Sequence, residues 1–216
     1  MATSVFAPIG RGSLGRPPAR VSRPMSVVWL NGPVGAGKST LAYALRALVN
    51  PVAAVALLDE DEVREAMADA ATTSGRSNAT SVERLGAIAR VLAQQGFVVV
   101  VTASDAQASA LLWNRANLPG YQEVFLRASV ETIKHRSRRR RPLGSPSQPP
   151  PQPLPHTTRM ERSSLPAPDL TIDMDNPEPP ELLAFRVAVL IPEFVIAASG
   201  AANPANPATS RFRRGA

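Results

Sequence analysis

The sequence predicts an α/β fold, a three-layer sandwich in which helices cover both faces of a mostly parallel five-stranded sheet. One observation is the alternation of short apolar runs with segments of helical periodicity, which is typical of right-handed crossovers between parallel strands. Another is a glycine-rich loop, residues 32–39, directly after the first apolar run. The length of 216 residues and the 44% share of hydrophobic residues are enough for one such core.

Short apolar runs predict the strands. The run Phe97–Ala103 (FVVVVTA) is continuous and rich in β-branched residues, as expected of a central parallel strand that is buried on both faces. The run before the glycine-rich loop, SVVWL, predicts a second buried strand. The predicted strands span residues 26–30, 55–59, 97–103, 121–128 and 169–173.

The segments between the strands predict helices. Residues 80–96 give the clearest one, because Thr80 and Glu83 form a capping-box pattern and Gly96 stands where a helix usually stops. The predicted helices span residues 39–50, 61–70, 80–96, about 105–117, 129 into the arginine run, and 176–191. The further expected N-caps are Ser104 or Asp105, Ser129 and Asn176.

Proline content divides the chain into one domain and its flanking segments. Residues 142–168 predict neither a helix nor an inner strand, because proline fixes φ and lacks a backbone donor. We therefore expect a domain over residues 25–191 that contains a mobile, proline-rich lid at 142–168. Residues 1–24 and 192–216 are expected to be disordered extensions.

Composition narrows the classes of function. The net charge is +7, but the basic residues gather at the chain ends and in RSRRRR (Arg136–Arg141), without interleaved aromatic residues. This pattern favours an anionic nucleotide over a nucleic acid as partner. Cysteine is absent, which excludes thiolate metal sites and suits a cytoplasmic protein, and no apolar run predicts a membrane helix. The oligomeric state stays open, a homodimer included.

The glycine-rich loop predicts binding of ATP with Mg²⁺. Residues 32–39 (GPVGAGKS) fit G-x-x-x-x-G-K-[ST] without a gap. The glycines let successive backbone N–H groups point at phosphate oxygens, Lys38 reaches the β- and γ-phosphates, and Ser39 offers a hydroxyl to Mg²⁺. The alternative is a chance match in a glycine-rich turn, which the apolar strand before and the helix after disfavour. The predicted phosphate-binding residues are Gly32, Pro33, Val34, Gly35, Ala36, Gly37, Lys38, Ser39 and Thr40.

A pair of carboxylates follows the second predicted strand, where open α/β sheets bind their ligands. One of Asp59 and Asp61 can hold the Mg²⁺ water shell, and the other can orient or deprotonate an acceptor hydroxyl. Arg64 follows one helical turn later and can clamp an anionic acceptor. The alternative is structural: Asp61 caps a helix whose solvated face carries Glu62 and Glu65.

The arginine cluster Arg136–Arg141 has two interpretations. A mobile basic lid at this position would close over ATP and bring charge to the transferred phosphoryl group. The alternative is a solvated basic run at a helix C-terminus, which the helix dipole favours. The sequence does not select one catalytic arginine from the cluster.

Four segments in order resemble the adenylylsulfate (APS) kinases, over about residues 26–191. They are VVWLNGPVGAGKSTLAYAL, LLDEDEVR where that family typically has L-D-G-D-x-V-R, IARVLAQQGFVVVV and PAPDLTID. The resemblance implies a phosphate-loop NTPase fold and transfer of the ATP γ-phosphate to the 3′-hydroxyl of APS. It also implies catalytic roles for Lys38, Asp59 and Asp61, Mg²⁺ binding at Ser39 and Asp59, and contact of Arg64 and Arg84 with the acceptor.

The chain departs from the family pattern around the acceptor. Glu60 stands where the family has glycine, and TASDAQ replaces an isoleucine-serine-proline stretch after the third strand. The family's nucleotide-binding segment is matched at Arg84 alone, with Ser81 in place of its asparagine. The lid is rich in arginine and proline instead of carrying the family's lysine.

Together these features lead to one functional hypothesis and its rivals. The hypothesis is a kinase that uses Mg·ATP to phosphorylate a hydroxyl of a small anionic metabolite, with APS as the leading acceptor. Rival acceptors are a sugar acid, a nucleoside or an antibiotic. From other classes, the rivals are a nucleotide-binding regulator or ATPase without an acceptor, and a non-catalytic homologue that only binds nucleotide.

Overall fold

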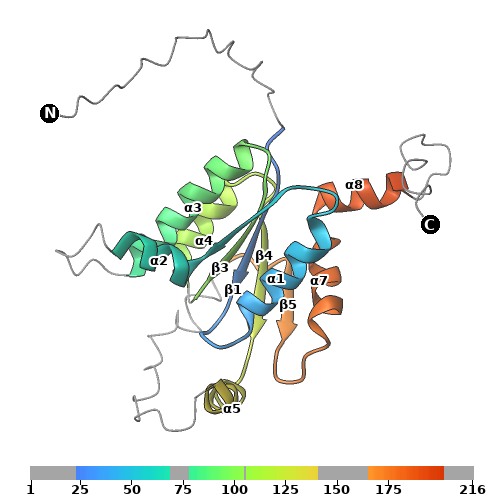
Figure 1. Ribbon diagram of the computed structural model, residues 1–216. Helices are drawn as coiled ribbons and strands as arrows, with labels where there is room; N and C mark the ends of the chain where they lie inside the picture. The colour runs from blue at the N-terminus through green and yellow to red at the C-terminus, as the bar shows by residue number, and fades with distance from the viewer. Residues whose placement is uncertain (1–22, 69–77, 105, 141–164, 202–216) are drawn as a thin grey trace, which may run out of the picture.

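A computed structural model of the chain describes residues 23–68, 78–104, 106–140 and 165–201. Its centre is a five-stranded sheet in the order β2-β3-β1-β4-β5, in which all four strand pairs are parallel (Figure 1). The strands are β1 Val27–Asn31, β2 Val55–Asp59, β3 Val98–Ala103, β4 Gln122–Arg127 and β5 Leu170–Asp173. The α/β fold class and the five predicted strands are therefore confirmed, with a shift of one residue at six of the ten strand ends.

Helices cover the two faces of the sheet (Figure 1). On one face lie α1 and α7, and on the other α3 and α4, while α5 lies beyond the carboxyl ends of the strands. The helices are α1 Lys38–Val49, α2 Glu60–Ala68, α3 Asn78–Gln94, α4 Ala108–Asn117, α5 Val130–Arg140, α7 Pro180–Ala188 and α8 Pro192–Ala201.

Strand β1 separates two hydrophobic cores. Val28 and Leu30 pack with α1 and α7, whereas Val27 and Trp29 pack with α3 and α4. Each of these four side chains is fully buried, since successive side chains of a strand point to opposite faces. This two-sided burial explains why the strand sequences are continuous apolar runs instead of alternating ones.

Two predicted helix starts are wrong, and one is confirmed. Helix α3 begins at Asn78 instead of Thr80, so Thr80 lies inside the helix. Helix α4 has Gln107 as its N-cap, because the N–H of Ser104 instead donates to a carboxylate of the candidate site. Ser129 does cap α5, since its Oγ accepts a hydrogen bond of 3.2 Å from the Thr132 N–H.

The last two helices also differ from the prediction. Helix α7 begins at Pro180 after Pro179, not at Asn176, because the prolines keep the residues before them extended. The prediction of a disordered tail from residue 192 is wrong for α8, which begins at Pro192, a residue that fits the first turn of a helix. The ring of Phe194 in α8 meets that of Phe185 edge-to-face, with centroids 6.4 Å apart.

Other predicted features lie outside the described residues. These are the N-terminal extension up to residue 22, Asp105, most of the proline-rich segment (residues 141–164) and the end of the chain from residue 202. Within the described residues, no single helix is long and apolar enough to cross a membrane. Helices α7 and α8 pass that length and composition test only when taken together, across a bend of 92°.

Candidate active site

The phosphate loop joins the end of β1 to the start of α1. Gly32, Gly35 and Gly37 have φ angles of +148°, +84° and +107°, which residues other than glycine rarely adopt. At Gly32 the reason is also steric, because a Cβ there would lie 2.4 Å from the carbonyl oxygen of Leu126 in β4. The loop thus turns tightly against the sheet and leads into the N-terminus of α1, a favourable place for phosphate.

Lys38, the first residue of α1, lies across this loop. Its side chain is buried, and its Nζ donates to the carbonyl oxygens of Gly32 at 2.8 Å and Pro33 at 3.0 Å. The loop start is held by Asn31, whose Oδ1 accepts from the Gly32 N–H at 2.9 Å. The ammonium group is therefore held inside the curve of the loop, where phosphate oxygens would lie.

Asp59, at the end of β2, connects three elements. Its Oδ2 accepts from Ser39 Oγ at 2.9 Å and from Thr102 Oγ1 at 2.8 Å, and its Oδ1 accepts from the Asp61 N–H at 3.0 Å. Burial favours the neutral carboxyl, but the hydrogen bonds from Thr102, Ser39 and the backbone outweigh burial and lower the pKa of Asp59. Asp59 is thus held as a carboxylate next to the phosphate loop.

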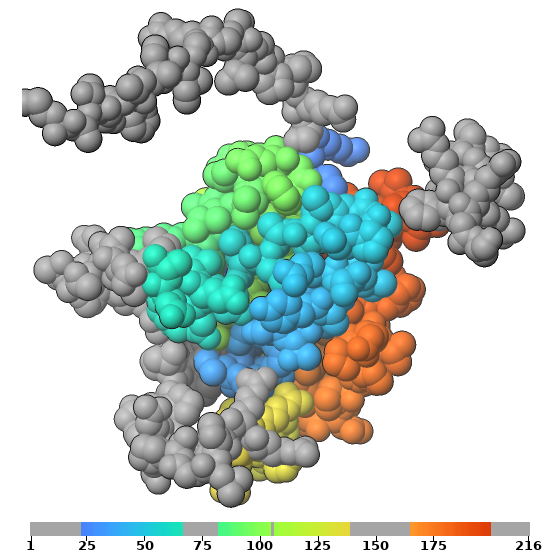
Figure 2. Space-filling view, in the orientation of Figure 1, coloured from blue at the N-terminus to red at the C-terminus, as the bar shows by residue number. Residues whose placement is uncertain are grey.

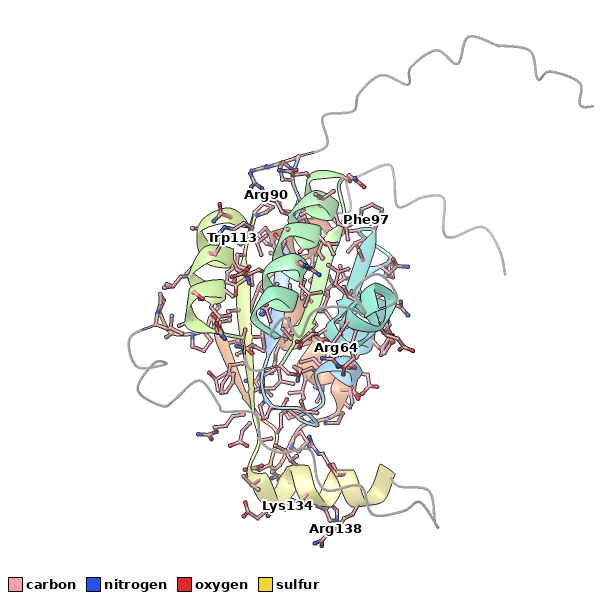
Figure 3. All side chains as sticks on the ribbon, turned by 90° about the vertical axis from the view of Figure 1, so that its left-hand side faces the viewer. Arg64, Arg90, Phe97, Trp113, Lys134 and Arg138 are labelled. Atoms are coloured by element: carbon pink, nitrogen blue, oxygen red, sulfur yellow. The ribbon has the colours of Figure 1, made fainter. Side chains whose placement is uncertain are left out.

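Asp61 and Arg64 lie at the exposed start of α2. They form an ion pair one helical turn apart, with 74% of the Asp61 side chain and 50% of the Arg64 side chain exposed (Figure 3). Helix α2 adjoins α1 on the face seen in Figure 2, where the Tyr43 hydroxyl lies 3.4 Å from Glu62 Oε1. The Asp61 N–H donates to Asp59, which caps the helix, and the Asp61 carboxylate is paired with Arg64 at the exposed rim, where a ligand can reach it.

A hollow at the carboxyl ends of β1, β2 and β3 brings the loop and the carboxylates together. It is lined by Val34, Gly35, Gly37, Lys38, Ser39, Thr40, Asp59, Glu60, Asp61, Thr102 and Ser104. Arg64 and Arg84 are not among its lining residues, and Arg84 is exposed on α3. Six of the nine residues predicted to bind phosphate and both predicted aspartates therefore line one hollow. The predicted residues that do not line it are Gly32, Pro33, Ala36, Arg64 and Arg84.

Glu60 is a buried carboxylate in this hollow, with 7% of the residue exposed. Its Oε2 accepts a hydrogen bond of 2.7 Å from the Ser104 N–H, just after β3. Burial is the main cause that raises the pKa of Glu60, against the hydrogen bond from Ser104 and the charge of Arg64, which act in the opposite direction. Sequence reasoning did not assign this side chain to the site.

Arg136 of α5 contacts the phosphate loop; in the cluster, Arg138 is the other arginine whose side chain the structure describes. Its two terminal nitrogens donate to the carbonyl oxygens of Ala36 and Met174, each at 2.7 Å. Lys134 and Arg138 on the same helix are exposed and point away from the sheet (Figure 3). A second, largely apolar hollow lies beside Arg136, on the β5 and α7 side of the loop, and includes Met174, Pro177 and Leu183.

Thr102 and Asn31 were, like Glu60, not assigned to the site from the sequence. Thr102, which donates to Asp59, is the last residue but one of an otherwise apolar run, and Asn31, which holds the loop, ends the run of β1. A polar residue at the carboxyl end of a fully buried strand was the available signal.

The oxygen atoms around Asp59 suit a hard cation. Mg²⁺ prefers oxygen ligands, and is usually held by one or two carboxylates together with substrate phosphates. Ser39 Oγ, Thr102 Oγ1 and the Asp59 carboxylate supply such oxygens beside the phosphate loop. No group of three or more His, Cys, Asp or Glu residues in the described part of the chain forms a metal site by itself, and water and phosphate oxygens would complete the shell of such an ion.

Comparisons with known proteins agree with this geometry. The family model for adenylylsulphate kinase matches residues 24–141. An adenylyl-sulfate kinase from Deinococcus deserti is 39% identical over 111 residues, which are 51% of this chain and 61% of that protein. One from Myxococcus xanthus is 34% identical over 112 residues, 50% of this chain and 60% of that protein. The chain thus spans about three fifths of the length of these relatives.

Solved structures share the fold. The APS kinase of Mycobacterium tuberculosis in complex with AMPPNP and APS aligns with a TM-score of 0.56 and 23% identity, over 78% of this chain and 98% of that chain. A sugar kinase from Janibacter sp. aligns with a TM-score of 0.53 and 18% identity, over 82% of this chain and 98% of that chain.

Proposed function

Because this chain belongs to the adenylylsulphate kinase family, we propose that it transfers the γ-phosphate of ATP to a hydroxyl of a small anionic metabolite, with APS as the leading acceptor. The observation that carries the proposal is the hydrogen-bonded unit of Ser39, Asp59 and Thr102. It places a carboxylate from β2 directly against the phosphate loop, in one hollow. A site that only binds phosphate would not require a carboxylate next to the loop.

The two hollows suggest how ATP lies. The phosphate loop separates them, and Gly35, Gly37 and Thr40 line both. The apolar hollow beside Arg136 suits the base, whereas the polar hollow with Lys38 suits the γ-phosphate and the acceptor. Backbone N–H groups of the loop and the ammonium of Lys38 would then hold the phosphate chain across the loop.

The residues around Asp59 fit a Mg²⁺ ion that arrives with ATP. Ser39 and Asp59 would hold it, with Thr102 fixing the orientation of the carboxylate through its 2.8 Å hydrogen bond. When bound there, the ion supplies positive charge to the phosphate oxygens, in addition to that of Lys38. The low pKa of Asp59 keeps this ligand ionised throughout the neutral range.

Asp61 is the residue that we assign to the acceptor hydroxyl. It lines the polar hollow, is largely exposed, and leaves the capping of α2 to Asp59. In the proposed step it orients the hydroxyl and accepts its proton while the hydroxyl oxygen attacks the γ-phosphorus, and ADP leaves in line. Arg64, paired with Asp61 at the rim, would attract the anionic part of the acceptor, and Arg84 is retained as a second candidate for it.

The test is ADP formation from Mg·ATP with and without APS, followed by sugar acids, nucleosides and antibiotics with free hydroxyls. A large rise with APS is the expected result. A rise with another compound alone would keep the kinase and replace the acceptor. ATP binding without acceptor-dependent ADP formation would contradict the proposal and favour a regulatory or non-catalytic nucleotide-binding protein.

A further inference from the structure

Glu60 fills one corner of the proposed acceptor hollow. It is the first residue of α2, it is buried, and its carboxylate lies between the carboxyl ends of β2 and β3. The Ser104 N–H, which follows β3, donates to Glu60 Oε2 at 2.7 Å, and both residues line the hollow. In parallel sheets of this kind, the ligand usually contacts groups at the carboxyl ends of the strands, and the Ser104 N–H is such a group. Here the protein's own carboxylate takes that donor.

Two departures noted in the sequence meet at this contact. Glu60 stands at the position where the resemblance predicts glycine, and Ser104 belongs to the TASDAQ segment that replaces another motif. A glycine would bring neither a side chain nor a charge into this corner. Ser104 of the TASDAQ segment and the Glu60 carboxylate are hydrogen-bonded to each other, although they are 44 residues apart in the chain.

The charges around the corner are mostly negative. Asp59 and Asp61 line the same hollow, so Glu60 is a third carboxylate there. Lys38 also lines the hollow, but its ammonium donates to the carbonyl oxygens of Gly32 and Pro33, and Arg64 is paired with Asp61 at the exposed rim. An anionic group placed in the corner would meet like charge at the buried Glu60 carboxylate, which is unfavourable.

We infer that Glu60 is a specificity-determining residue, which excludes anionic groups from the corner beside Ser104 and leaves that corner to a neutral, hydrogen-bond-donating part of the acceptor. The inference rests on the proposed function, since it assigns the hollow to the acceptor. The acceptor's anionic group would then bind toward the rim at Arg64. An acceptor that carries a hydroxyl in the corner would donate to Glu60, in place of the Ser104 N–H or beside it.

The test compares two nucleotides that differ in one charged group. The dissociation constants of APS and adenosine are measured by calorimetry on the protein saturated with Mg·ADP. The variants are Glu60→Gln, which removes the charge but keeps an oxygen that can accept from Ser104, and Glu60→Gly, which removes the side chain. Glu62→Gln is the matched control, because Glu62 is an exposed carboxylate on the same helix.

The expected result is a change in the ratio of the two dissociation constants, APS over adenosine. It should fall about tenfold in Glu60→Gln, because the like-charge contact with the anionic group is lost, and further in Glu60→Gly. It should stay unchanged in Glu62→Gln. An unchanged ratio in both Glu60 variants would overturn the inference, and so would failure of all the proteins to bind either nucleotide. A merely structural role of Glu60 would weaken both nucleotides equally.

This readout is independent of catalysis. If no protein transfers phosphate to any acceptor, the proposed function fails, but the binding ratio still decides the role of Glu60. If transfer to APS is absent in the wild type and arises in Glu60→Gly, the inference is supported and APS is excluded as the acceptor of this chain.

Discussion

Ser39 Oγ donates a hydrogen bond of 2.9 Å to Asp59 Oδ2, which joins the start of α1 to the end of β2. The two strands that lead to these residues, β1 and β2, are not neighbours, because β3 lies between them. Thr102 at the end of β3 donates to the same oxygen and fills the space between them. The phosphate loop and the acidic end of β2 therefore form one hydrogen-bonded unit at the carboxyl ends of the strands.

Lys38→Ala should lower ATP turnover by about 100-fold or more, because the loop loses the ammonium that is held within it. The cooperative unfolding transition should remain. The chain has one other lysine, Lys134, which is exposed on α5 and supplies a matched control. Steady-state turnover of both variants checks this. Unchanged turnover in Lys38→Ala would remove the basis for the phosphate-loop assignment.

Asp61→Asn should lower phosphoryl transfer by about 100-fold or more while ATP affinity stays within about twofold, since Asp61 faces the acceptor and does not cap the helix. Single-turnover transfer and equilibrium ATP binding are the two measurements. Glu65→Gln, at another exposed position of α2, should change neither. Equal losses of transfer and binding in Asp61→Asn would instead indicate a structural role.

Arg136→Ala should raise KM for ATP about tenfold and lower the free energy of unfolding by about 2 kcal/mol, because two hydrogen bonds from a charged donor are lost. Arg138→Ala, on the same helix but exposed, should change stability by less than about 0.5 kcal/mol. Denaturant unfolding measures the free energy of unfolding of the two variants, and steady-state kinetics measures their KM for ATP. If both arginines behave alike, the cluster acts only through its summed charge.

Gly32→Ala should destabilise the fold by about 3 kcal/mol, because the added Cβ would lie 2.4 Å from the Leu126 carbonyl oxygen at a φ of +148°. Gly35→Ala is the comparison, since its φ of +84° is strained but its Cβ would meet only Ile133 at an ordinary 3.5 Å. It should cost about 1 kcal/mol. Urea unfolding of both variants tests this, and equal losses would contradict the steric account of Gly32.

Most of the fold could be predicted from the sequence, for a physical reason. Strands β1 and β3 are buried on both faces, so their sequences are continuous apolar runs that allow little ambiguity. The phosphate loop has fixed spacing, because each of its glycines adopts a positive φ that other residues rarely adopt. Helix starts were less certain: α4 begins only after Gln107, while the Ser104 N–H donates to Glu60, a contact between residues distant in sequence.

The rest of the site depends on contacts between distant parts of the chain. Thr102 becomes important because β3 lies next to β2, which the sequence alone does not show. Arg136 differs from the exposed Arg138 because α5 lies on the loop with the Arg136 side chain toward Ala36. Glu60 belongs to a charged run that is typical of solvated helix starts, yet it is buried against Ser104.

The most direct test of the proposed function follows the label from γ-³²P-labelled ATP with APS as acceptor, in the wild type and in Lys38→Ala. The account predicts a labelled, phosphorylated acceptor in the wild type and none in the variant. Label that appears only as inorganic phosphate, at a rate that no acceptor in the panel changes, would contradict it.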